Sequence, residues 1–305
     1  MAIVYIGHPA CLEHRTGFKH PESAERLRVL GALSERLEGE GWLRRLDAPV
    51  AERCFIESVH DPEHVSRVLD WRGKGFQRFD SDTVVSKGSG AAALRAAGAA
   101  MAGVDAVSRG AASSAFCAIR PPGHHALPAK AMGFCIFNNV VLAVRHALTV
   151  HGVARTAVLD FDAHHGNGTE AMLRNDSRVL LCQTFQTDFF PFTGEVADEP
   201  HRVNVPLATG AGGGDFRDAV EKRWLPALRD FRPELILVSA GFDAHSADPL
   251  SGLEFSDSDY AWIGEIVANE ARAFNAKVVS VLEGGYDLKA LERSVDGYLR
   301  GMAGV

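Results

Sequence analysis

Two segments of the chain carry carboxylate and imidazole groups at a spacing suited to holding one cation. Asp160, Asp162 and His164 alternate along the chain, so on a strand their side chains would project to one side. Asp243 adds a carboxylate from a separate segment. Two carboxylates and one imidazole suit zinc, and three protein ligands leave a position open for water or substrate. Iron and manganese accept the same ligands, so these residues predict a catalytic metal site without selecting the metal.

Two adjacent histidines, His124 and His125, follow a pair of prolines. A histidine with a pKa near neutrality can take a proton from water at a metal and later deliver one to a leaving amine. Asp160 and Asn167 are the candidate partners that would orient these rings. Because a carboxylate favours the charged imidazolium and an amide does not, the histidine that faces Asn167 is the better candidate for a general base.

Tyr286 directly follows two glycines in the run EGGY. The glycines permit unusual backbone angles and a close approach, so the phenol could be directed into a site. A phenol that donates to a developing oxyanion beside a metal ion would stabilise an acyl-transfer transition state. Taken singly, each of these motifs is more often structural, and their combination is what indicates chemistry.

The elements that must position these groups alternate between apolar runs and helical patterns. Apolar runs without polar alternation are typical of strands buried on both faces of a parallel sheet. The sequence therefore predicts an α/β fold, a single open doubly wound domain over residues 1–305 with a mostly parallel sheet of about eight strands flanked by helices. The polar motifs follow strand ends, where such sheets bind ligands. The apolar runs are 2–6, 114–119, 156–161, 179–183, 202–207, 235–240 and 278–282, and the helical patterns are 22–38, 89–108, 137–151, 215–230, 257–275 and 287–302.

Composition excludes several classes of function. The formal charge of −7 and the lack of a long basic run argue against a nucleic-acid surface. No apolar run approaches the roughly 20 residues of a membrane span, and the N-terminus does not resemble a secretory signal. Five cysteines without a CxxC spacing argue against a disulfide framework and fit a reducing compartment. We therefore expect a cytoplasmic protein, whose oligomeric state the sequence leaves open.

Taken together, the motifs resemble the arginase–deacetylase fold and, within it, the histone deacetylase superfamily. That superfamily includes bacterial deacetylase-like amidohydrolases and acetylpolyamine amidohydrolases. The resemblance extends from about residue 18 to about residue 298, and the forms of three motifs look more like the class II branch than class I. It is densest in RPPGHHA, MGFCIFNN, LDFDAHHGNGT, SAGFDAHSADPL and LEGGYD.

The resemblance implies one catalytic zinc ion, bound by Asp162, His164 and Asp243. It also implies a structural potassium ion near Asp160, Asp162 and His164, held by backbone carbonyls and by a hydroxyl on the next strand. Gln183 stands at the position of that hydroxyl in this chain, which weakens the potassium prediction relative to the zinc prediction.

The resemblance also implies roles for the other polar groups. His125 would be the general base and then the general acid, oriented by Asn167. His124, paired with Asp160, would act electrostatically. Tyr286 would polarise the carbonyl of the amide that is cleaved. The expected reaction is the hydrolysis of an N-acetyl or N-acyl lysine, or of a similar amine.

The same resemblance predicts an apolar tunnel for the acyl-lysine side chain. Gly133, Phe134 and Phe190 would line it, with the two rings on either side of the methylene groups. Leu250 stands where a polyamine-selective relative carries a glutamate, so selection for a polycation is not provided at this position. The leucine therefore favours an acylated lysine peptide or protein over an acetylpolyamine as the substrate.

Three alternatives remain open at this point. The first is an amidohydrolase for acetylpolyamines or other small acylated amines on the same scaffold. The second is a binuclear manganese ureohydrolase, which would need further ligands where the sequence offers only Asp243 and a distant Asp248. The third is a metal-stabilised binding module, which would be expected to lack a ligand, the base or the tyrosine.

Overall fold

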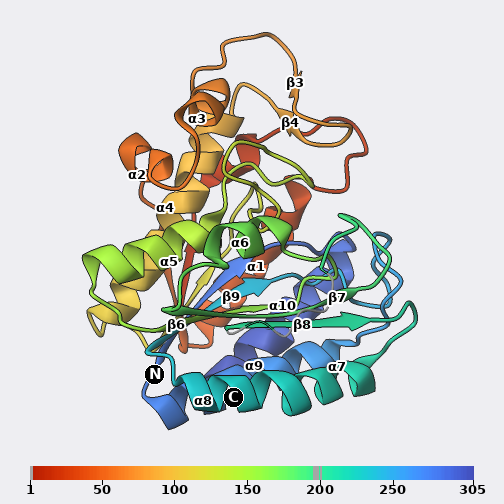
Figure 1. Ribbon diagram of the computed structural model, residues 1–305. Coiled ribbons are helices and arrows are strands. Elements are labelled where there is room, and N and C mark those ends of the chain that lie inside the picture. The colour runs from red at the N-terminus through yellow and green to blue at the C-terminus, as the bar shows by residue number, and fades with distance from the viewer. Residues whose placement is uncertain (1–2, 195–198, 200) are drawn as a thin grey trace.

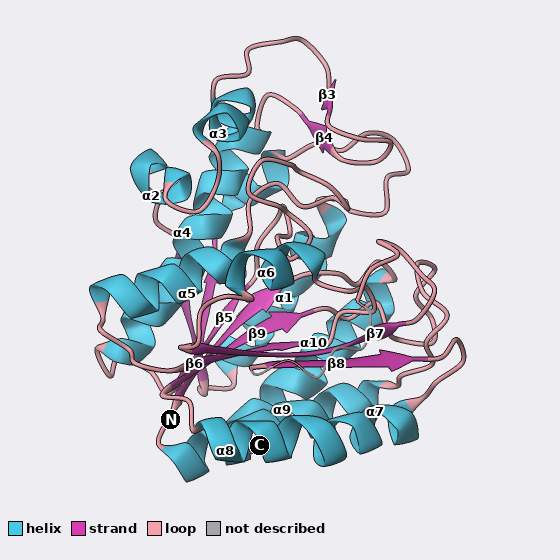
Figure 2. Ribbon diagram, viewed as in Figure 1, coloured by secondary structure: helices cyan, strands magenta, loops and turns pink. Residues whose placement is uncertain are grey.

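An eight-stranded, wholly parallel sheet runs through the molecule (Figures 1 and 2). The computed structural model describes residues 3–194, 199 and 201–305. The strand order is β2-β1-β5-β10-β9-β6-β7-β8, so β10, the last strand in the chain, lies at the centre. The strands are β1 Ile3–Gly7, β2 Leu43–Asp47, β5 Ser114–Cys117, β6 Thr156–Asp160, β7 Val179–Gln186, β8 Arg202–Leu207, β9 Leu235–Ala240 and β10 Lys277–Leu282. This architecture confirms the predicted α/β class and the parallel sheet of about eight strands.

Helices cover both faces of the sheet (Figure 2). One hydrophobic cluster joins the sheet to α1, α7, α8, α9 and α10, and a second joins its other face to α4 and α5. Within the described residues, no helix has the length and hydropathy of a membrane span. The helices are α1 Glu25–Gly39, α2 Arg53–Glu57, α3 Pro62–Leu69, α4 Ser89–Ser108, α5 Asn139–Val150, α6 Asn167–Leu173, α7 Gly213–Ala219, α8 Leu225–Phe231, α9 Asp257–Phe274 and α10 Leu288–Ala303, and a small antiparallel pair is formed by β3 Gln77–Arg78 and β4 Val84–Val85.

The alanine-rich helix α4 packs closely against the sheet. Ala96, Ala99 and Ala100 are fully buried and belong to the cluster that contains Val279 of β10. Their small side chains let the helix axis approach the sheet, so tertiary packing stabilises a segment that would be a weak isolated helix.

Local structure differs from the sequence prediction at three places. Strand β2 lies at the sheet edge and exposes four of its five residues, so it has no apolar run to reveal it. The predicted helix 215–230 is divided into α7 and α8 by a π-helical turn at Val220–Trp224. The segment that contains the predicted metal ligands leaves the sheet earlier than expected, because β6 ends at Asp160.

A buried group of charges connects the N-terminal segment to the loops that follow β5 and β10. Glu22, Arg26 and Arg120 are completely buried. Arg120 donates to Glu22 Oε2 over 2.7 Å, and Arg26 Nη1 donates to Glu22 Oε1 over 3.3 Å. Arg26 also donates through Nε to the carbonyl of Gly285 over 2.6 Å. These contacts hold the glycine turn before Tyr286 in place.

Replacing Glu22 by glutamine is expected to destabilise the protein by about 3 kcal/mol at pH 7, since the buried arginines lose their counter-charge. Burial alone would raise the pKa of Glu22, but the charge and hydrogen bonds of Arg120 lower it to about 2. A depressed folded-state pKa contributes stability above the unfolded-state value of about 4.5. The difference between the two proteins should therefore shrink as the pH falls from 4.5 toward 2. Urea unfolding of both proteins across this range measures it, and a constant difference would contradict the assignment.

Candidate active site

Three of the predicted metal ligands meet just beyond the carboxyl ends of β6 and β9. His164 Nδ1 lies 3.0 Å from Asp162 Oδ1 and 3.1 Å from Asp243 Oδ2. One ligand atom from each of the three residues lies within 4.8 Å of the other two. Asp162 and Asp243 are buried, and the His164 side chain is only 11 % exposed. Loops whose ligands His164 and Asp243 are 79 positions apart in the sequence thus direct three ligand atoms at one small volume.

The donor set fits a divalent cation of the zinc class. Each carboxylate has one oxygen fixed by the backbone, since Ala163 N–H donates to Asp243 Oδ1 and Gly284 N–H donates to Asp162 Oδ2, both over 2.9 Å. The other oxygens face the imidazole. Burial and the neighbouring charge of Asp162 raise the pKa of Asp243. Two buried carboxylates this close repel each other, and a bound cation would offset that repulsion.

The prediction that a strand directs Asp160, Asp162 and His164 to one side is wrong. They do not alternate along a strand, because β6 ends at Asp160 and the following residues form bends. Local hydrogen bonds orient them instead. Asp162 N–H donates to Asp160 Oδ1 over 3.1 Å, and His164 N–H donates to Asp162 Oδ1 over 2.9 Å. Asp160 itself faces His124.

The two adjacent histidines have different partners. His124 Nδ1 lies 3.1 Å from Asp160 Oδ2, and His125 Nδ1 lies 2.8 Å from Asn167 Oδ1, at the start of α6. Burial would lower the pKa of His124, but the charges of Asp162 and Asp160 raise it well above the usual value. Burial, together with His124 and His164, lowers the pKa of His125 well below it. One ring is thus held charged and the other neutral.

A cavity of about 280 Å³ leads to these groups. Gly133, Phe134, Phe190, Leu250 and Tyr286 all line it. The Phe190 ring centroid lies 5.1 Å from that of His125, and the Phe134 centroid lies 5.7 Å from that of Tyr286. Gly133 has a φ of +54°, and a Cβ there would come within 2.4 Å of His125 Cδ2. Glycine at this position therefore lets the cavity wall approach the histidine.

Two carboxylates that the sequence analysis did not assign to the site hold its loops. Asp248 Oδ2 accepts from the N–H groups of Tyr286 and Asp287 over 2.5 and 3.1 Å. Glu283 Oε2 accepts from the N–H groups of Gly123 and His124 over 2.7 and 3.2 Å. Both acids stand inside the recognised motifs, but their sequence positions do not show that they accept backbone donors from other loops.

Two further side chains help to position the tyrosine and histidine rings. The Arg26 guanidinium lies 4.9 Å from the Tyr286 ring centroid, on the side of the buried charge group. The Phe189 ring stacks on His164 with a centroid separation of 5.4 Å, next to the predicted wall residue Phe190. In the sequence, the one sign that Phe189 belongs to the site is its position next to Phe190.

The backbone of Gly284 lies against both carboxylates. A Cβ at this position would lie 2.0 Å from Asp243 Oδ2 and 2.7 Å from Asp162 Oδ2. Gly284→Ala is therefore expected to displace a metal ligand and to weaken zinc affinity by about tenfold or more. Zinc content after equilibrium dialysis measures this. The matched control is Gly31→Ala in α1, where a Cβ meets no atom within 4 Å. Equal zinc affinity in the two variants would contradict the expectation.

Comparison with known proteins identifies the family. The model of the histone deacetylase domain matches residues 20–302. A histone deacetylase-like amidohydrolase of Pseudomonas aeruginosa is 38 % identical over 278 residues, which cover 88 % of this chain and 72 % of that protein. An uncharacterised protein of Synechocystis is 36 % identical over 301 residues, or 97 % of both chains. The crystal structure of the HDA15 HD domain superposes with a TM-score of 0.93 at 30 % identity, covering all of this chain and 90 % of the other.

The fold and the relatives thus define a protein of the deacetylase and amidohydrolase class with the arginase–deacetylase architecture. The chain belongs to the histone deacetylase family.

Proposed function

We propose that this protein is a zinc-dependent hydrolase that cleaves the amide of N-acyl lysine in a peptide or protein. One observation carries the proposal. The histidine pair, His164 and Tyr286 line a single cavity whose walls include Phe134 and Phe190, and Asp162 and Asp243 lie beside His164. The family match supports the amide-hydrolase class independently of this geometry.

Asp162, His164 and Asp243 would hold the zinc ion, which supplies Lewis-acid polarisation and lowers the pKa of water. Because Nδ1 of His125 is held by Asn167, its Nε2 is the nitrogen that can take a proton from the attacking water. The same nitrogen then protonates the leaving amine.

His124 and Tyr286 would stabilise the charge that develops during the reaction. His124, kept cationic between Asp160 and Asp162, provides a positive charge beside the reacting atoms. The phenol of Tyr286 donates to the developing oxyanion. Burial raises the pKa of Tyr286 well above its usual value, so the phenol retains its proton at neutral pH.

Apolar residues of the cavity wall suit a long aliphatic side chain. Phe134 and Phe190 would pack against the methylene groups of lysine, and Gly133 gives the chain room between them. Leu250 presents an apolar surface to the same cavity. An amine with several charges would find no carboxylate at position 250 to pair with.

The test is a substrate panel with metal-defined protein. Protein stripped with a chelator should be inactive, and one equivalent of zinc should restore hydrolysis of an acetyl-lysine peptide. Its kcat/KM should exceed that for acetylputrescine by about tenfold or more, equivalent to about 1.4 kcal/mol. A higher kcat/KM for acetylputrescine would instead identify small acylated amines as the substrate class. No hydrolysis of any acyl amine by the zinc-loaded protein would refute the proposal.

The potassium site stays a prediction from the family resemblance. Gln183 Oε1 accepts from Gly166 N–H over 3.0 Å, and Gln183 Nε2 donates to Asn204 Oδ1 over 3.1 Å. The amide of Gln183 is therefore engaged by protein groups beside Asp160. Comparing activity and thermal stability in potassium and in sodium buffers tests whether the ion is required.

A further inference from the structure

A second group of metal-ligating side chains lies between α4 and α5, away from the candidate active site. Asp105 stands in the last turn of α4, His146 lies in α5, and His151 caps the C-terminal end of α5. Helix α4 leads into β5 and helix α5 leads into β6. These helix ends therefore lie near the amino ends of the strands, whereas the candidate active site lies beyond their carboxyl ends.

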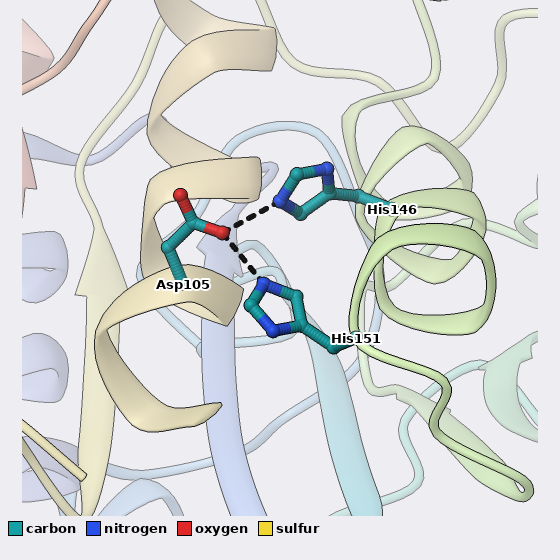
Figure 3. Close-up of side chains that lie close together, drawn as sticks. All are labelled: Asp105, His146 and His151. Atoms are coloured by element: carbon teal, nitrogen blue, oxygen red, sulfur yellow. Dashed lines mark hydrogen bonds and ion pairs between the residues drawn. The ribbon is translucent and has the colours of Figure 1, made fainter. Parts of the chain in front are cut away.

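The three side chains converge on one point (Figure 3). The Nε2 atoms of His146 and His151 each lie 2.7 Å from the same oxygen, Oδ1 of Asp105. One ligand atom from each residue lies within 4.8 Å of the other two. The side chains of Asp105, His146 and His151 are 28 %, 14 % and 15 % exposed, so a solvent ion can reach them. The second oxygen of Asp105 contacts Arg109 over 3.3 Å.

The two contacts of Asp105 with the imidazoles need little change to hold a metal ion. Zinc bonds of about 2.0–2.2 Å in a tetrahedral arrangement separate ligand atoms by about 3.3 Å. The two contacts of 2.7 Å would therefore open by roughly 0.6 Å each. Without a metal ion, Nε2–H of each ring donates to Asp105 Oδ1. On metal binding each neutral ring would carry its proton on Nδ1 instead, and the unprotonated Nε2 would be the ligand atom.

The electrostatics of the position favour a cation. Both α4 and α5 end here, and the C-terminal ends of helices carry partial negative charge. Asp105 adds a full negative charge between them. Two imidazoles and one carboxylate select a zinc-class ion over magnesium or calcium, which prefer oxygen ligands.

We propose that Asp105, His146 and His151 form a second binding site for a divalent zinc-class ion, with solvent completing the coordination. The ion would connect α4 to α5 and so stabilise the helices that cover β5 and β6. Its role is structural, since the site lies near the amino ends of the strands and the cavity lies beyond their carboxyl ends. This inference does not depend on the proposed reaction.

The test counts zinc ions bound by the full chain after the first site has been disabled. In the Asp162→Asn/Asp243→Asn background, chelator-stripped protein dialysed against zinc is expected to bind one equivalent. Adding His146→Gln and His151→Gln should weaken that binding by about 100-fold or more. Glutamine is chosen because its amide N–H can still donate to Asp105 while it is a poor zinc ligand. Equal zinc content with and without the glutamines would overturn the proposal.

Thermal unfolding provides a second readout with its own control. Zinc at about 100 times its Kd should raise the Tm of the Asp162→Asn/Asp243→Asn protein by about 4 °C and leave that of the glutamine variant unchanged. Arg109→Ala removes the side chain that contacts the other oxygen of Asp105 without removing a ligand, so it should retain the zinc equivalent. Loss of zinc in Arg109→Ala, or an equal rise in Tm in both proteins, would contradict the ligand assignment.

Discussion

Replacing His125 by alanine is expected to lower kcat for an acetyl-lysine peptide by about 10³-fold, within the range of general acid–base catalysis. The reason is that, of the two adjacent histidines, His125 has the ring held neutral and an Nδ1 fixed by Asn167. Steady-state kinetics of the zinc-loaded protein measures the change. Zinc content should remain at the wild-type level, because His125 is not one of the three ligands.

A control separates loss of the base from loss of the fold. A hydroxamate binds zinc through two oxygens, so it should still bind to His125→Ala if the cavity is intact. Small imidazoles added to the solution should restore part of the rate by entering the space that the side chain leaves. A kcat within tenfold of the wild-type value would eliminate His125 as the general base.

Replacing Tyr286 by phenylalanine is expected to lower kcat by about 10²- to 10³-fold with little change in KM. Phenylalanine keeps the ring that contacts Arg26 and Phe134, so only the hydroxyl is lost. A donor that acts on the developing oxyanion contributes more to the transition state than to substrate binding, which is why kcat should carry the effect.

The matched control is Tyr298→Phe. The hydroxyl of Tyr298 is buried and pairs with Ser280 Oγ over 2.7 Å, away from the cavity. Its removal should reduce stability by about 1 kcal/mol and leave kcat unchanged. If the two variants had equal kcat values, the oxyanion role of Tyr286 would be refuted.

The sequence predicts the buried parallel strands well because their signal is local. The run 235–240 is largely apolar, and the structure places the fully buried strand β9 at the same residues. Strand β2 gives no such signal, since an edge strand can expose arginines on its outer side. The predicted helix 215–230 is interrupted by the π-helical turn at Val220–Trp224. Such a turn contains one extra residue, which hydrophobic periodicity does not reveal.

The site shows the same division between local and non-local information. Chemically distinctive groups such as Asp162, His164 and Asp243 stand out in the sequence, and the structure brings them together. Their catalytic roles stay predictions. The sequence does not show that Asp248 and Glu283 hold the loops of the site, because they do so by accepting hydrogen bonds from backbone N–H groups of distant loops.

The sheet order has a consequence for biosynthesis. Strand β10 follows β5 and β9 in the chain and inserts between them, so one edge of each of these strands stays unpaired until β10 has left the ribosome. Gly284 and Tyr286 follow this same strand. Nascent chains that stop before β10 would expose two unpaired apolar edges and would need protection from aggregation. The enzyme therefore gains its central strand and its tyrosine in the same late step of folding.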